Sequence, residues 1–207
     1  RSLEVMLMPI PNYATQAEEA PTTWLNRWLR EAEASGELNP TAMALATLDA
    51  SGAPRNRFVL CKGVTDDGVR FFTNLESDKG TELARDQRVS VAFYWSILRR
   101  QVRLDGTVSP LDAAEADAYF ASRSRLSNLG AWASQQSRPI ETREELEAAV
   151  EAVSERFTED VPRPPFWSGF HLRAESWEFW EDRPGRIHDR WVLKPGEEGW
   201  LMWRLQP

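Results

Sequence analysis

The chain has 207 residues, of which 42% are hydrophobic and 28% charged, and its formal net charge is −7. This composition is typical of a folded globular protein and excludes a largely disordered chain. No apolar run reaches the roughly 20 residues that span a bilayer, and an acidic chain is a poor binder of nucleic acid, so we expect neither a membrane nor a nucleic-acid partner.

The first half of the chain predicts an arm, a helix and hairpins. Prolines at positions 9, 11 and 21 predict an extended N-terminal arm over residues 1–20, followed by a single domain over residues 21–207. Apolar residues at helical spacing from Thr22 predict a helix that ends at Gly36. Strands are predicted over 42–48, 57–62 and 69–73, and the short turns between them indicate antiparallel hairpins.

The second half continues the same pattern. A short helix capped by Ser77, strands at 89–95 and 101–108, and helices at 112–122 and 141–157 are followed by four strands, at 169–173, 176–180, 187–193 and 200–205. About eight or nine strands in a meander fit one α+β, mainly β domain. We therefore expect a closed or nearly closed antiparallel barrel with peripheral helices.

Cysteine and histidine are scarce. Cys61 is the only cysteine, so no intramolecular disulfide can form, which agrees with a reducing, cytoplasmic location. Cys61 lies in an apolar strand, which favours a buried, unreactive thiol. The two histidines, His171 and His188, do not form a metal-binding cluster with it, so we expect no metal site.

Two groups of residues are candidates for binding anions. If residues 187–193 and their approach are extended, Arg186, His188 and Arg190 project from one face, which suits a phosphate or an electron-rich carbonyl. Tyr119, Arg123 and Ser127 recur at i, i+4 and i+8, so a continuous helix would gather them into a phosphate cup. The alternatives are a solvated strand face and an ordinary helix packing face.

Weaker candidates lie elsewhere. Arg57 and Lys62 end a predicted strand on opposite faces, and Lys79 lies just inside a predicted helix start. The segment 130–137 and Gln101 offer amide and hydroxyl groups that suit a flat polar heterocycle. An edge strand, an exposed lysine and a capped loop are the alternatives.

The ordered set of these segments resembles the pyridoxamine 5′-phosphate oxidases, which are FMN enzymes with a split-barrel fold. The similarity runs from about Pro40 to Pro207 and rests on the motifs PTAMALAT (40–47), RFVLCK (57–62), FTNL (72–75), RQV (100–102), YFASRSRLS (119–127), GAWASQQS (130–137) and W-x5-RIHDR (180–190). It implies an FMN-binding split barrel, with an antiparallel barrel of six to eight strands and peripheral helices, and a homodimer with FMN at the interface.

The resemblance also implies roles for individual residues. The positions that match FMN-binding residues are Arg57, Phe58, Val59, Leu60, Cys61, Lys62, Phe72, Thr73, Lys79, Gln101, Gln136, Ser137, Trp180 and Arg190. The positions that match the binding site of the substrate phosphate are Lys62, Tyr119, Arg123 and Ser127. Arg186 and His188 match substrate-binding, catalytic positions beside the pyridine ring and the carbon that is oxidised.

The implied reaction is that of a pyridoxal 5′-phosphate synthase in pyridoxine biosynthesis. Pyridoxamine or pyridoxine 5′-phosphate, the phosphorylated B6 substrate, would lose a hydride from C4′ to flavin N5, and O2 would reoxidise the flavin to give H2O2. One departure stands out, because Asp78 occupies a position where the family usually has Arg. A carboxylate there either points away from the FMN phosphate or weakens FMN binding.

Two alternative functions stay open at this point. One is a related FMN oxidase of phenazine biosynthesis, which shares the C-terminal motif but resembles this chain less at the substrate-phosphate segments. The other is a non-catalytic flavin- or pyridoxal-phosphate-binding protein. Tyr119, Arg123 and Ser127 together favour a phosphorylated substrate.

Overall fold

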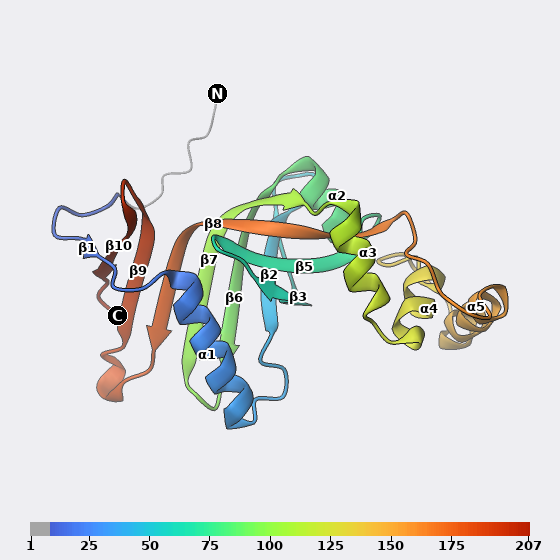
Figure 1. The fold of residues 1–207 in the computed structure, drawn as a ribbon, viewed down its shortest axis with the longest axis horizontal. Helices are drawn as coiled ribbons and strands as arrows, with labels where there is room; N and C mark the ends of the chain where they lie inside the picture. Colours follow the sequence, from blue (N-terminus) through green and yellow to red (C-terminus); the bar gives the residue numbers. More distant parts are fainter. Residues whose placement is uncertain (1–8) are drawn as a thin grey trace.

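The structure is a computed structural model that describes residues 9–207 (Figure 1). Its helices are α1 (Pro21–Ser35), α2 (Asp78–Arg85), α3 (Ala113–Ala121), α4 (Arg125–Ala133) and α5 (Arg143–Arg156), with one 3-10 turn, η1 (Pro184–Arg186). Its strands are β1 (Thr15–Gln16), β2 (Ala42–Leu48), β3 (Pro54–Leu60), β4 (Gly63–Val64), β5 (Gly68–Asn74), β6 (Arg88–Trp95), β7 (Arg100–Pro110), β8 (Trp167–Glu181), β9 (Asp189–Gly196) and β10 (Gly199–Arg204). Of the predicted arm, residues 1–8 lie outside the described residues, and β1 pairs with β10.

The strands form one antiparallel sheet, which confirms the α+β, mainly β class. Hydrogen-bonded neighbours follow the order β1-β10-β9-β8-β7-β6-β2-β3, with β5 added to β8 and β4 to β5. The sheet of the described residues is not closed, because β1 and β3 end the path without pairing to each other, so the fully closed form of the expected barrel is excluded. The sheet has ten strands, of which β1 and β4 contain only two residues each.

Strand β8 divides the sheet. Its first half pairs with β5 and its second half with β9, while β7 runs along both halves. Two separate strands were predicted here, but a bulge at Glu175 keeps one strand continuous, because Asp105 pairs with Ser176 and Gly106 with Ala174. A Cβ on Gly106 would lie 2.1 Å from the Arg173 carbonyl oxygen, so only glycine allows this close approach.

Helix α1 packs against the sheet, as its apolar spacing predicts. Leu25, Trp28 and Ala32 are buried, and the Trp24 ring stacks on Phe179 of β8 at a centroid distance of 4.2 Å. Gly36 ends the helix with φ of 87°, a left-handed conformation that favours glycine. These contacts anchor the N-terminal helix to the strand that carries much of the candidate site.

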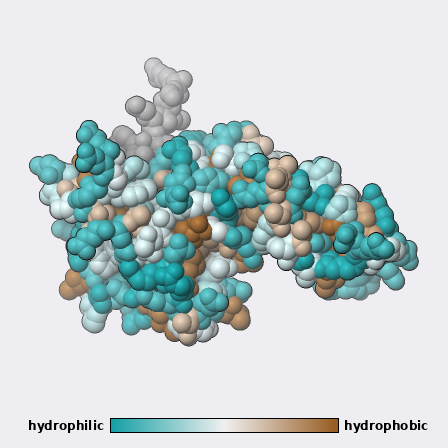
Figure 2. Space-filling model, viewed as in Figure 1, coloured by the Kyte–Doolittle hydropathy of each residue, from teal (hydrophilic) through white to brown (hydrophobic). Residues whose placement is uncertain are grey.

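The other end of the molecule is helical. Helices α4 and α5 pack against each other and project beyond the sheet (Figure 1). Figure 2 shows them as an arm that a concave outline separates from the sheet body. Within the described part of the chain, we find no helix with the length and apolar character needed to cross a membrane.

Candidate active site

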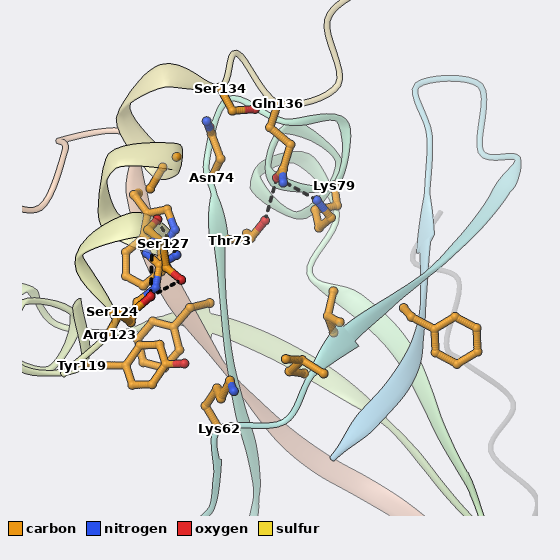
Figure 3. Close-up of a pocket in the computed structure, with 17 residues that line it drawn as sticks. Lys62, Thr73, Asn74, Lys79, Tyr119, Arg123, Ser124, Ser127, Ser134 and Gln136 are labelled. Carbon is orange, nitrogen blue, oxygen red and sulfur yellow. Dashed lines mark hydrogen bonds between the residues drawn. The ribbon is translucent and has the colours of Figure 1, made fainter. Parts of the chain in front are cut away.

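A cavity of about 570 Å³ lies between the sheet and helices α3 and α4 (Figure 3). This volume is in the range of small-molecule sites. The structure brings together eleven predicted site residues in its lining: Phe58, Val59, Leu60, Lys62, Phe72, Thr73, Lys79, Tyr119, Arg123, Ser127 and Gln136. Ser134 of the predicted segment 130–137 also lines it, as do Asn74, Ser124 and Trp167, for which no individual role was predicted.

Arg123 is held at one end of the cavity by aromatic rings. Its guanidinium carbon lies 4.7 Å from the ring centroid of Trp167 and 5.1 Å from that of Phe120, in cation–π geometry. Its Nη2 donates to the Ser127 carbonyl at 3.0 Å, while Nη1 is buried without a hydrogen-bond partner among the described residues. Burial lowers the pKa of Arg123, because desolvation disfavours its charge.

Two helices, α3 and α4, contribute to this cluster. The condition of a continuous helix through Tyr119, Arg123 and Ser127 is not met, because α3 ends at Ala121, close to the predicted end at Ser122, and Ser124 starts α4 as its N-cap. Arg123 therefore lies in the turn between the two helices. The three side chains still meet (Figure 3), since Tyr119 stacks on Phe72 of β5 at 4.0 Å and Ser124 Oγ lies 2.8 Å from Ser127 Oγ.

Lys79 occupies a separate part of the cavity. Its ammonium group donates to Gln136 Oε1 at 3.0 Å, and Thr73 donates to the same oxygen at 3.3 Å. Ser77 caps α2, as predicted, by accepting from the Gly80 N–H. Burial lowers the pKa of Lys79, and the nearby guanidinium of Arg57 lowers it further.

The charges of the lining favour an anionic ligand. Lys62, Lys79 and Arg123 line the cavity, and the described lining residues include no Asp or Glu. Partly buried cations without carboxylate partners are unfavourable until an anion binds. The Nη1 of Arg123, which lacks a partner, and the hydroxyls around it fit a phosphate group. Lys79 and its neighbours offer a second phosphate site. These residues therefore fit a phosphorylated cofactor and a phosphorylated substrate.

Several predicted residues lie outside this lining. Arg57 points to α2, where its Nη2 pairs with Glu82 at 2.7 Å. Cys61 is buried, and desolvation raises the pKa of its thiol to about 11, which agrees with an unreactive cysteine. Ser137 Oγ accepts from the Asp78 N–H at 3.2 Å. The Asp78 side chain is 64% exposed, lies 4.0 Å from Arg138 and does not line the cavity.

The remaining predicted residues form a second cluster, which we call the C-terminal corner: Gln101, Trp180, Arg186, His188 and Arg190. In the sheet, Trp180 of β8 pairs with Gln101 of β7 on one side and with Arg190 of β9 on the other. Arg190 Nε donates to Glu178 at 2.8 Å, and Nη1 donates to the Gln206 carbonyl at 3.0 Å. None of these five residues lines the cavity.

The expectation that Arg186, His188 and Arg190 share one strand face is wrong. Strand β9 begins only at Asp189, and Arg186 belongs to the turn η1. Gly185 and Arg186 have φ of 72° and 61°, so the backbone reverses here instead of extending. The turn brings the His188 ring to 4.7 Å from the Trp180 ring.

Two models of known protein families match this chain. A model of the pyridoxamine 5′-phosphate oxidase family matches residues 30–157, and a model of the pyridoxine 5′-phosphate oxidase C-terminal dimerisation region matches residues 167–207. The chain belongs to this family. The predicted family is thereby confirmed, and family membership supports the predicted cofactor, FMN.

Curated relatives cover most of the chain. Pyridoxine/pyridoxamine 5′-phosphate oxidase of Maricaulis maris is 53% identical over 183 residues, which are 87% of this chain and 82% of the relative. The enzyme of the same name from Bordetella pertussis is 48% identical over 193 residues, 93% of this chain and 91% of the relative.

Solved structures show the same fold. PhzG from Burkholderia lata, in complex with tetrahydrophenazine-1-carboxylic acid, is 32% identical with a TM-score of 0.85 and covers 91% of this chain and 93% of its own. A pyridoxamine 5′-phosphate oxidase-related, FMN-binding protein of Nostoc punctiforme is 17% identical with a TM-score of 0.72, covering 92% of this chain and 100% of its own. The sheet and helices are thus those of the split-barrel fold predicted from the motifs.

Proposed function

We propose that this protein is a cytoplasmic FMN-dependent oxidase that converts pyridoxamine or pyridoxine 5′-phosphate to pyridoxal 5′-phosphate, with O2 as acceptor and H2O2 as product. The observation that carries the proposal is the partly buried guanidinium of Arg123, whose Nη1 is buried beside the hydroxyls of the cavity and lacks a partner among the described residues. Curated relatives that share about half of its residues have the name of this activity.

The cavity residues would divide between two phosphorylated ligands. Lys62, Tyr119, Arg123 and Ser127 would bind the substrate phosphate, with Arg123 supplying charge-assisted hydrogen bonds. Lys79, Thr73 and Gln136 would bind FMN, together with the backbone and side chains of 57–62. Binding the phosphate far from the reacting carbon holds the substrate ring in place and lowers the entropic cost of the reaction.

The C-terminal corner of one subunit would complete the cavity of a second copy of the chain. Its residues lie in the segment that matches a dimerisation region, and they do not line the cavity of their own chain. Phe58 and Leu60 line that cavity yet stay 76% and 43% exposed, so a partner surface is needed to cover them. In the proposed homodimer, Gln101, Trp180 and Arg190 of one subunit would contact FMN bound at the interface.

FMN, when bound, accepts a hydride from the substrate and passes the electrons to O2. Arg190 would place a cation beside the ring system and stabilise negative charge there. Arg186 and His188 would lie beside the substrate ring and C4′. Glu178 holds the Arg190 guanidinium at 2.8 Å, which limits the orientations that this cation can take.

An absorption spectrum tests the proposal directly. The purified protein should be yellow, and anaerobic addition of pyridoxine 5′-phosphate should bleach the flavin band, because the substrate reduces the cofactor. Admission of air should restore the band and release H2O2. A yellow protein that is not bleached would indicate the non-catalytic binding protein instead.

A second candidate function is oxidation of a reduced phenazine precursor, favoured by the structural similarity to PhzG. Turnover of pyridoxamine 5′-phosphate and of a reduced phenazine carboxylic acid should be compared at equal concentrations. We expect turnover of the B6 phosphate to dominate, since the hydroxyl groups of Tyr119 and Ser127 and the cation of Arg123 suit a phosphate. Turnover of the phenazine alone would reject the first proposal.

A further inference from the structure

His188 of the C-terminal corner contacts a carboxylate, Asp182, that the proposed function does not use. Asp182 Oδ1 lies 2.8 Å from Nδ1 of His188, and the two side chains are only 12% and 20% exposed. Asp182 follows β8 directly and is held by Arg99 twice. Its N–H donates to the Arg99 carbonyl at 3.0 Å, and its carboxylate pairs with the Arg99 guanidinium. The acid is therefore fixed against the turn between β6 and β7.

Two contacts at Nδ1 of His188 make opposite demands on the position of the imidazole proton. The Arg183 N–H lies 3.2 Å from Nδ1 and requires a lone pair there, whereas the Asp182 carboxylate requires an N–H. The carboxylate contact dominates, because it is shorter and charge-assisted. A lone pair on Nδ1 would also face a carboxylate oxygen at 2.8 Å. The exposed Arg183 amide can donate to water instead.

The other side of the imidazole is fixed as well. The Trp180 ring packs on it at a centroid distance of 4.7 Å and an interplanar angle of 44°. The left-handed residues Gly185 and Arg186 form the turn that returns the chain to this position. With Nδ1–H bound to Asp182, Nε2 keeps its lone pair and is the nitrogen that can accept a proton.

We propose that Asp182 is a positioning residue that holds His188 in this tautomer, so that Nε2 accepts a proton from the substrate. The inference rests on the proposed oxidation. For the alcohol substrate, the C4′–H bond breaks with its electron pair as hydride transfers to FMN, the O–H bond breaks with its proton transferring to Nε2, and a C=O double bond remains. For the amine substrate, Nε2 takes a proton from the 4′-ammonium group, the C4′–H bond then breaks with its electron pair as hydride, and a C=N iminium remains. Water hydrolyses this iminium to the aldehyde and releases ammonia. In both cases Asp182 stabilises the imidazolium that forms.

The tautomer can be measured without any activity assay. The chain has two histidines, so the ¹⁵N spectrum of the FMN-loaded protein labelled at histidine contains two imidazoles. His171 serves as an internal reference, since its Nε2 contacts Asp67 at 3.0 Å and Thr65 at 2.9 Å, and we expect the opposite tautomer there. At about pH 8.5, where an ordinary imidazole is neutral, His188 should show Nδ1–H. A His188 protonated at Nε2 in the wild type would overturn the inference.

Two matched variants extend the test. Asp182→Asn should shift His188 toward the Nε2–H tautomer and lower kcat about 100-fold with little change in KM, because proton transfer is lost while binding is kept. Asp189→Asn removes a carboxylate from the same loop, one that contacts Arg183 and Arg204 instead of the imidazole, and should leave the tautomer unchanged. The thermal midpoint of each variant shows whether it is folded. If Asp182→Asn does not fold, the tautomer of His188 in the wild-type spectrum decides whether the inference holds.

The outcomes separate this inference from the proposed function. A kcat for Asp182→Asn within about 2-fold of the wild type would reject the positioning role, whatever the tautomer. A wild-type protein that oxidises neither B6 phosphate would reject the proposed function, and the positioning role with it. In that case an Nδ1–H signal that depends on Asp182 would still identify the pair as a structural contact.

Discussion

Two regions of this chain present cations, and they treat charge in opposite ways. Around the cavity, Lys62, Lys79 and Arg123 have no ion-pair partner among the described residues. In the C-terminal corner, Arg190 pairs with Glu178 and His188 with Asp182, whereas the exposed Arg186 has no ion-pair partner among the described residues. Unpaired cations that are partly buried, here Lys79 and Arg123, favour a bound anion, whereas paired ones are held in orientation. The cavity therefore suits phosphate groups, and the corner suits the ordering of side chains around a ring.

Removal of a cation should have different consequences in the two regions, and the largest effect is expected in the corner. Arg190→Ala should lower kcat roughly 100-fold, because it removes a preorganised charge beside the flavin. The free energy of unfolding should fall by about 1 kcal/mol, as for a partly exposed ion pair. Steady-state kinetics and urea unfolding measure the two quantities.

Arg103→Ala is the matched control for Arg190→Ala. Arg103 contacts the same carboxylate, Glu178, at 3.4 Å but belongs to β7 and has no proposed contact with flavin. Its turnover should stay within about 2-fold of the wild type. Equal losses of activity and stability in both variants would show that Arg190 is structural.

In the cavity, Arg123→Ala should raise the KM for the phosphorylated substrate roughly 10- to 100-fold and change kcat little, since it removes binding that is present before the reaction begins. Arg125→Ala is the control, because its guanidinium donates to the carbonyls of Phe157 and Glu159 rather than into the cavity. A large fall in kcat at unchanged KM would contradict the assignment of Arg123 to the phosphate.

Lys79→Gln should weaken FMN binding by about 10-fold, as expected for a lost charge-assisted hydrogen bond. Because the pKa of Lys79 is lowered, its charge is lost at a lower pH than for an ordinary lysine. FMN binding to the wild type should therefore weaken as pH rises through that lowered pKa, and the variant should lack this dependence. Flavin fluorescence titrations measure both effects. Arg85→Gln, on the last turn of α2 and bonded to the Leu48 carbonyl, should bind FMN like the wild type.

The last prediction concerns stability rather than activity, at Cys61, which lies next to the cavity without lining it. Burial raises the pKa of its thiol from 9.0 to about 11, so the unfolded chain loses the proton first as pH rises. Stability from this group is fully present below pH 9 and is lost between about pH 9 and 11, a loss of about 2–3 kcal/mol. Cys61→Ala should flatten the pH dependence of unfolding in this window. An unchanged slope would show that other groups dominate it.

Many local elements follow from residue patterns that physical chemistry explains. The strand predicted over 42–48 is β2, the apolar spacing from Thr22 predicts α1, Ser77 caps a helix as expected, and Asp112 begins one. Where the sequence predicts two strands, the bulge at Glu175 joins them into β8. No local signal reveals this, because the bulge depends on the register with β7.

The candidate site, too, is predicted by the sequence only in part. The ordered motifs identify the family and most of the cavity lining, since they fall on residues that the fold brings together. They do not reveal Trp167, which supports Arg123 from a distant strand, or the acids Glu178 and Asp182 that pair with residues of the corner. Spacing alone placed Arg186 and His188 on a strand, whereas two left-handed residues form a turn there.

The sequence by itself determined the fold class, the family, and which residue types carry charge and hydroxyl groups, because periodicity and motif order are properties of the chain. Only the tertiary structure decided that Asp78 points away from the cavity, that the sheet of the described residues stays open, and that Arg190 and His188 have carboxylate partners there whereas Lys79 and Arg123 have none. These features depend on contacts between residues far apart in the chain, and local sequence does not encode which partners meet.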